Sequence, residues 1–153
     1  PLTQSYEAVQ GKLSGVIAVG GADFEEGVDK GLAAAVEPTM GWSKGARKIL
    51  VILGDAPPHA ADMPATLKMA EGFAKDGWVV NAINVGPPQL TGKAFRQICK
   101  AGGGASVDAS AGTQTLVQEM LILSMGQEHR QALSGFVEEV RAVREGMTKK
   151  AGK

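Results

Sequence analysis

Cysteine occurs only once in this sequence, at Cys99, so no disulfide can form within the chain and the redox compartment stays open. Aromatic residues make up 5% of the chain, which argues against a stacking platform for nucleic-acid bases. The 16 basic residues balance 16 acidic ones, so no net charge draws the chain to nucleic acid or to an anionic membrane. No apolar run reaches membrane-spanning length. We therefore expect neither a nucleic-acid partner nor a membrane span.

What the sequence does have is enough apolar residues for one soluble globular domain, with a hydrophobic fraction of 44% over 153 residues. The chain begins at Pro1 rather than methionine. We therefore expect a chain that has been processed or cut from something longer. The localisation stays open between the cytoplasm and export by a removed upstream signal.

The stretch KILVILGDAPPH, residues 48–59, organises the chain. Residues 48–53 contain five consecutive apolar positions, which predicts a strand buried on both faces. Asp55 follows Gly54 at the carboxyl end of that strand, where parallel sheets collect ligand-binding groups. Two prolines then hold residues 56–59 extended. A carboxylate on such a stiff loop suits a metal ion or a polar ligand, and the alternative is that Asp55 only caps a turn.

Helices and strands alternate along the rest of the chain. Asp23 and Glu26 form a capping-box pattern at the start of a helix that Pro38 ends. We expect the other helices over residues 3–14, 62–77, 90–101, 113–124 and 127–147, and further strands over 78–85 and 106–109. Alternation with crossover helices from residue 48 onward predicts a parallel sheet in an α/β fold.

Three stretches together resemble a bacterial von Willebrand factor A-type (vWA) domain, in their order and spacing. They are PLTQSYEAVQGKLSGVIAVGGADFEEGVDKGLAAAV, RKILVILGDAPPHA and FRQICKAGGGASVDAS. The resemblance covers roughly residues 1–124, and the middle stretch is its most specific part. It implies a doubly wound, mostly parallel, Rossmann-like sheet with helices on both faces. It also implies a metal-ion-dependent adhesion site that binds Mg²⁺, or Ca²⁺ or Mn²⁺, through oxygen ligands, with an acidic side chain of a protein ligand completing the coordination.

The family's metal ligands carry over to this chain only in part. The first metal-site loop of the family is a D-x-S-x-S motif, which is absent here. The second loop supplies a threonine after a glycine pair, whereas Ala22 follows Gly20 and Gly21 here, so a ligand from this loop has to be Asp23. The aspartate of the third loop matches Asp55. The resemblance therefore implies Asp55 and Asp23 as metal ligands and no catalytic residue, and the alternative for Asp23 is a helix cap.

The missing motif has a structural consequence, because in vWA domains the strand before it lies beside the strand matched by residues 48–53. We therefore expect an open, apolar edge on that strand. We infer that residues 1–124 are the carboxyl-terminal part of a vWA-like domain whose amino-terminal strands are missing from this chain. The alternative is that a second chain supplies those strands. After this domain we expect a terminal amphipathic helix at 125–148 and a frayed tail at 149–153.

Several other residues have a structural and a functional interpretation. Cys99 lies on the apolar face of its helix and is expected to be a buried, small hydrophobic residue. His59 can share a site with Asp55 or stabilise its loop. The glycines at 102–104 follow a helix and are expected to end it rather than bind phosphate. The apolar stripe of residues 127–147 can bind a partner helix or cover the domain's own sheet.

Three functions follow from these observations. The first is a non-enzymatic protein-interaction module of vWA type that binds a protein ligand through a divalent cation. The second is a metal-dependent hydrolase, since Gly54 and Asp55 followed by His59 resemble the G-D-x-H motif of metallophosphoesterases. That class needs further ligands on later strands, where only Asn84 and Asp108 are available. The third is a vWA scaffold that has lost its metal and binds through its surface alone.

Overall fold

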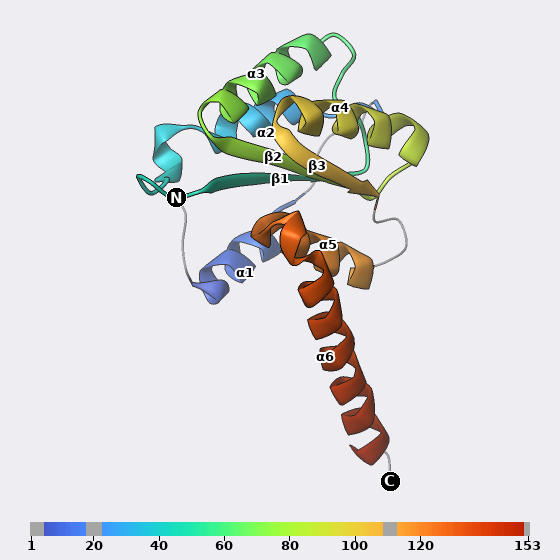
Figure 1. The fold of residues 1–153 in the computed structure, drawn as a ribbon. Coiled ribbons are helices and arrows are strands. Elements are labelled where there is room, and N and C mark those ends of the chain that lie inside the picture. Colours follow the sequence, from blue (N-terminus) through green and yellow to red (C-terminus); the bar gives the residue numbers. More distant parts are fainter. Residues whose placement is uncertain (1–4, 18–22, 109–112, 152–153) are drawn as a thin grey trace.

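A three-stranded parallel sheet forms the centre of the computed structural model, which describes residues 5–17, 23–108 and 113–151 (Figure 1). The strand order is β1-β2-β3, and the strands are β1 (Lys48–Gly54), β2 (Trp78–Asn84) and β3 (Gly103–Asp108). Helix α3 (Met63–Lys75) connects β1 to β2, and helix α4 (Lys93–Ala101) connects β2 to β3. This arrangement confirms the predicted α/β fold with a parallel sheet.

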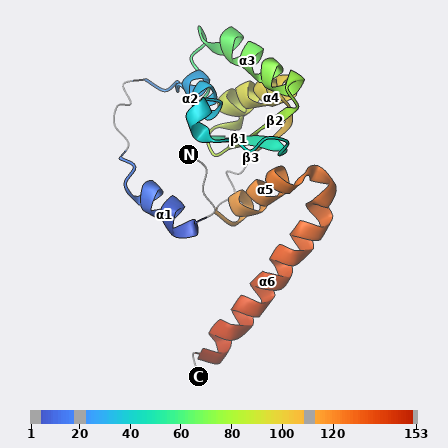
Figure 2. The same ribbon diagram turned by 90° about the vertical axis from the view of Figure 1, so that its left-hand side faces the viewer.

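Helices cover both faces of the sheet. Helix α2 (Val28–Ala35) lies with α3 and α4 on one face (Figure 1). On the other face lies α5 (Thr113–Met125), which contacts β1 and β2, while α1 (Tyr6–Ser14) lies on the same side but apart from the sheet, with exposed side chains (Figures 1 and 2). Helix α6 (Arg130–Ala151) follows α5 after a short turn and projects away from the sheet (Figure 2). The sheet is therefore the middle layer of three.

Side chains alternate between the two faces of each strand. Leu50, Val80 and Ala82 point to the face covered by α2, α3 and α4, where most of the buried apolar residues lie. That core consists of Leu32, Leu50, Ala70, Phe73, Val80, Ala82, Phe95, Ile98 and Cys99. Ile83 points to the other face and packs with Leu123 of α5 and the half-buried Val51. Burial raises the pKa of the Cys99 thiol to about 12, in agreement with its predicted role as a small hydrophobic residue.

Strand β1 lies at the edge of the sheet, and β2 lies at its centre. The prediction that residues 48–53 are buried on both faces is therefore wrong. Only Leu50 of β1 is buried, whereas Leu53 is 51% exposed and the central strand is buried from Val80 to Asn84. The open edge expected for β1 is confirmed within the part of the chain that the structure describes.

The second helix begins later than predicted. Asp23 and Glu26 do not form a capping box, because α2 starts at Val28 and its N-cap is Gly27, without a side-chain hydrogen bond. The intervening residues instead pair with the loop after β1, which removes them from the helix. A parallel β-bridge, which the sequence does not predict, joins Glu26 to Pro58 in that loop.

Other boundaries differ by a few residues. Strand β3 starts at Gly103, so only Gly102 of the glycine run serves to end the preceding helix. The helix predicted from residue 90 divides into a π-helical turn, Pro88–Gly92, and α4. Among the described residues, none of the helices combines the length and the apolar character needed to cross a bilayer.

Candidate functional site

Asp55 lies where the sequence places it, directly after β1 at the carboxyl end of the sheet. Its main chain is fixed by the neighbouring loop, because the Thr91 hydroxyl donates a hydrogen bond of 2.8 Å to the Asp55 carbonyl oxygen. Gly86 packs so closely against the Asp55 main chain that a Cβ atom at this position would collide with it. The Asp55 side chain itself is exposed. The loop is therefore held through its backbone, and none of the residues that the structure describes pairs with the carboxylate.

The loop after Asp55 also holds the segment that precedes α2. The Glu26 amide donates a 2.9 Å hydrogen bond to the Pro57 carbonyl oxygen, next to the bridge between Glu26 and Pro58. Proline has no backbone N–H group, so Pro57 takes part in this contact as an acceptor, through its carbonyl oxygen. The pairing brings Glu26 to the same end of the sheet as Asp55.

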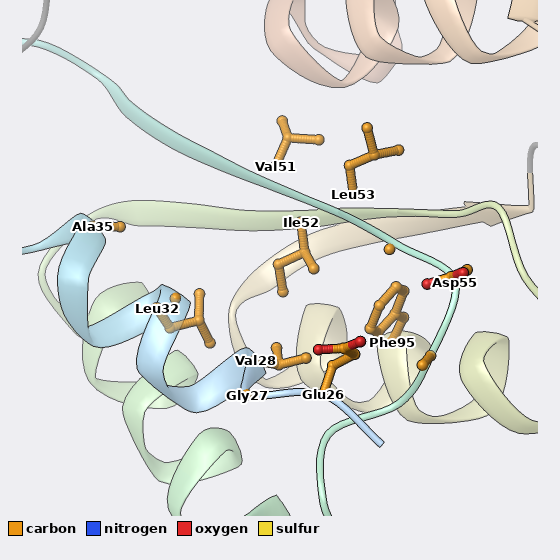
Figure 3. A pocket seen from close by; sticks show the side chains of 13 residues that line it. Glu26, Gly27, Val28, Leu32, Ala35, Val51, Ile52, Leu53, Asp55 and Phe95 are labelled. Carbon is orange, nitrogen blue, oxygen red and sulfur yellow. The ribbon is translucent and has the colours of Figure 1, made fainter. Parts of the chain in front are cut away.

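A cavity of about 440 Å³ lies between α2 and the free edge of β1 (Figure 3). Glu26 and Asp55 line it at the end where the Phe95 ring also lies (Figure 3). The rest of its wall is mainly apolar, with Val28 and Leu32 on α2 facing Ile52 on β1. The site thus combines two acidic side chains with an apolar groove.

Glu26 is the residue that the sequence analysis missed as a site residue. The capping-box pattern assigned it to a helix, where its carboxylate would satisfy a backbone amide. In the structure Gly27 separates Glu26 from α2. A signal for this was present in the sequence, since glycine before an apolar helical repeat is itself an accepted N-cap.

Asp23 lies beside His59 rather than among the residues of the cavity. Its Oδ2 atom is 3.8 Å from His59 Nδ1, and its side chain is 65% exposed. Glu25 lies closer to His59, with Oε2 at 3.3 Å from Nδ1, while its Oε1 accepts a hydrogen bond from the Ala60 amide. His59 and Glu25 therefore join the two loops, which agrees with a loop-stabilising histidine.

The remaining polar residues at this edge bind one another. The buried Asn84 amide donates hydrogen bonds to Asp108 Oδ1 at 2.7 Å and to the Gly86 carbonyl oxygen at 3.2 Å. Arg96 contacts the other oxygen of Asp108 at 3.4 Å. This network explains Asn84 and Asp108 as residues that fix the loops after β2 and β3.

The two predicted metal ligands lie in different places, with Asp55 at the cavity and Asp23 beside His59. Within residues 5–17, 23–108 and 113–151, no group of three or more His, Cys, Asp and Glu side chains is placed to hold a metal ion. Gly20, Gly21 and Ala22, which carry the second-loop prediction, lie outside the described residues. Among the described residues, Asp55 and Glu26 are the two carboxylates that line the cavity. Two carboxylates suit Mg²⁺, which keeps several of its waters, better than Ca²⁺, which takes six to eight oxygen ligands.

Comparisons of this chain with protein-family models, with curated proteins and with solved structures found no match.

Proposed function

We propose that this chain is a non-enzymatic protein-interaction module of vWA type that binds its ligand at the carboxyl end of the sheet. The observation that carries the proposal is the state of Asp55. Its main chain is held by Thr91 and Gly86, and none of the described residues makes a hydrogen bond or ion pair with its carboxylate. A rigidly placed, unpaired carboxylate is available for an external partner.

The partner of this carboxylate is proposed to be a divalent cation, with Mg²⁺ favoured by the donor set. Asp55 would hold the ion, with Glu26 as the other carboxylate that lines the cavity. Waters and an acidic side chain of the protein ligand would complete the octahedral coordination that Mg²⁺ demands. The cation would supply the positive charge that lets an acidic ligand approach an acidic edge of the sheet.

Thermal unfolding with and without Mg²⁺ tests the proposal. A cation that binds only the folded chain stabilises it by about 2.7 kcal/mol at a concentration of 100 times its Kd. We expect Mg²⁺ to raise the melting temperature, EDTA to reverse the effect, and Asp55→Ala to abolish it. Asp76→Ala is the matched control, because Asp76 is an exposed aspartate at the far end of α3.

The alternative is a metal-free vWA scaffold that binds through its surface. The placement of Asp23 favours it, because Asp23 lies beside His59 and contributes no ligand to the cavity. A melting temperature that is indifferent to Mg²⁺, Ca²⁺, Mn²⁺ and EDTA would contradict cation binding and support this scaffold. A hydrolase is supported less well than either, since the His59 ring faces Glu25.

A further inference from the structure

Helix α6 carries an exposed apolar stripe. Its members Phe136, Val140 and Val143 are 59%, 49% and 58% exposed, and α6 projects away from the sheet (Figure 2). Helix α5 contacts the first turns of α6, where Ser134 accepts a hydrogen bond of 2.8 Å from α5 and Arg130 donates one of 2.7 Å to it. The exposed stripe therefore lies outside the hydrogen-bonded contact between α5 and α6.

The spacing of the stripe is that of a coiled coil. Phe136, Val140 and Val143 follow one another at intervals of four and three residues, and Met147 continues the series in the sequence. Apolar residues at alternating intervals of three and four occupy the a and d positions of a heptad, which pack between the helices of a coiled coil. Phe136 and Val143 are then d positions, and Val140 and Met147 are a positions. The stripe is therefore suited to a second helix with the same repeat.

The charged residues of α6 divide into two groups by their spacing. Four charges of alternating sign follow one another at intervals of three or four residues, which stabilises a single helix, namely Glu138, Arg141, Glu145 and Lys149. Glu139 has no basic residue at either interval, and Arg144 has no acidic one. In the heptad these two residues take positions g and e, which flank the stripe. Their sequence spacing thus calls for partners on another helix.

We propose that a second copy of this chain supplies that helix, and that the two α6 helices form a parallel coiled coil. In a parallel, in-register coil, position g of one helix faces the position e that lies five residues later on the other helix. Arg144 follows Glu139 by five residues, so Glu139 of each copy would pair with Arg144 of the other. A two-fold axis along the coil makes this pair twice. The helix is therefore complementary to itself in both apolar spacing and charge.

Antiparallel pairing of the same stripe lacks this complementarity, because position g then faces position g of the other helix. In the register that pairs Phe136 with Val140, Glu139 would face Glu139 of the other copy, and like charges would oppose each other. In the register that pairs Val140 with Val143, Glu139 would face Gly146. The charges therefore select the parallel orientation.

This dimer goes beyond the proposed function and uses none of the residues that line the cavity. The series from Phe136 to Met147 spans less than two full heptads, so we expect a weak dimer that dissociates on dilution. In the dilute monomer Phe136 remains exposed, so its truncation weakens the dimer and leaves the free energy of unfolding of the monomer nearly unchanged. Failure of the dimer would therefore leave cation binding untouched, and the reverse also holds.

Sedimentation velocity of the full chain over a wide concentration range tests the dimer. We expect a reversible dimer, and Val140→Lys should raise its dissociation constant by about ten-fold or more, because a charge would enter the apolar seam from both helices. Val140 is 49% exposed, so this variant is expected to fold. Leu53→Lys is the matched control, because Leu53 is 51% exposed and lies on β1, away from α6.

Exchange of the flanking charges tests the ion pair. Glu139→Lys or Arg144→Glu alone sets like charges opposite each other twice and should weaken the dimer, whereas the double variant should restore it. Glu138→Lys makes the same change of charge on the outer face of the coil and should weaken the dimer less. A double variant no stronger than either single one would contradict the pairing of Glu139 with Arg144.

Cross-linking tests the orientation. In a parallel, in-register coil each residue of the stripe lies opposite the same residue of the other copy, so Phe136→Cys and Val143→Cys should each form disulfide-linked dimers on mild oxidation. An antiparallel coil can bring at most one of these two positions opposite itself. The original chain is the blank, because its one cysteine, Cys99, is buried. A monomer at every concentration would overturn the proposal, as would a dimer that Val140→Lys leaves intact, and cross-linking of one position alone would overturn the parallel orientation.

Discussion

The two faces of the sheet are packed very differently. The face covered by α2, α3 and α4 holds a core of nine buried residues from all three helices and two of the strands. Among the described residues, the cluster on the opposite face contains two buried residues, Ile83 and Leu123, and Ile122 of α5 is also fully buried. The helices on that side expose large apolar residues, namely Val9, Leu13, Val117, Met120, Leu121, Met125, Phe136, Val140 and Val143.

This difference shows where the chain is complete in itself and where it is not. The α2–α4 side meets the usual condition for a stable layer, with side chains that are buried on folding and in contact with one another. The α5–α6 side presents apolar stripes, and exposed apolar surface of this extent is typical of a contact with another segment or protein. We therefore expect mutations on the two sides to differ in their effect on stability.

The largest effect is expected for Phe95→Ala. Phe95 is fully buried and touches the space beside Gly54 as well as the α2–α4 core. Truncating a buried phenylalanine removes its transfer free energy and leaves a cavity, which costs about 3–5 kcal/mol. Urea denaturation should show this loss as a lower midpoint with an unchanged slope.

Phe136→Ala is the counterpart on the other side of the sheet. Its side chain is 59% exposed on α6, so its truncation should change the free energy of unfolding by no more than about 0.5 kcal/mol. A cost similar to that of Phe95→Ala would break the comparison, since it would mean that Phe136 is buried in solution.

The sequence predicted the side of the sheet covered by α2–α4 better than the side with α5 and α6. Helices α3 and α4 have buried residues at helical spacing, such as Phe95, Ile98 and Cys99 on α4, and the strands of this core are short apolar runs. Periodicity identifies such elements because one face of each is buried within the domain. The stripe of α6 is equally regular, yet α6 projects from the sheet (Figure 2). Periodicity tells which face is apolar but not what covers it.

The site was predicted only in part, for a related reason. Asp55 follows a strand, and its place at the end of the sheet depends on local sequence alone. Glu26 reaches the same end of the sheet through a bridge to Pro58, which lies 32 residues later in the chain. No local sequence pattern encodes such a pairing. The same non-local pairing removed Asp23 from the expected helix start and left it beside His59.

An effect smaller than that of Phe95→Ala is expected for Asn81→Ala, because this change weakens the contact between helix α5 and the sheet. The buried Asn81 amide donates a 3.1 Å hydrogen bond to the Leu123 carbonyl oxygen of α5, and its oxygen accepts one of 2.9 Å from the Ala105 amide of β3. Leaving these buried groups unpaired costs about 1–3 kcal/mol.

Hydrogen exchange locates that effect. The amides of α5 and β3 should exchange faster in Asn81→Ala than in the original chain. Asn84→Ala is the control, because Asn84 binds Gly86 and Asp108 and has no bond to α5. Equal protection of α5 in both variants would mean that Asn81 does not hold this helix on the sheet.

An effect smaller than that of Asn81→Ala is expected at the junction of α5 and α6. Arg130 donates two hydrogen bonds to the Glu119 carboxylate, at 2.7 and 2.8 Å, and these bonds raise the pKa of Arg130, so it stays charged at any working pH. Arg130→Leu should lower the free energy of unfolding by about 0.5–1 kcal/mol. Arg96→Leu, which removes a single exposed contact of 3.4 Å, should lower the free energy of unfolding less.

Urea denaturation measures the free energy of unfolding of both variants, and 1 M salt should shrink the difference between them. A cost for Arg130→Leu as large as that of Phe95→Ala would mean that α6 is as much a part of the folded unit as α4, and the contrast between the two sides would then fail.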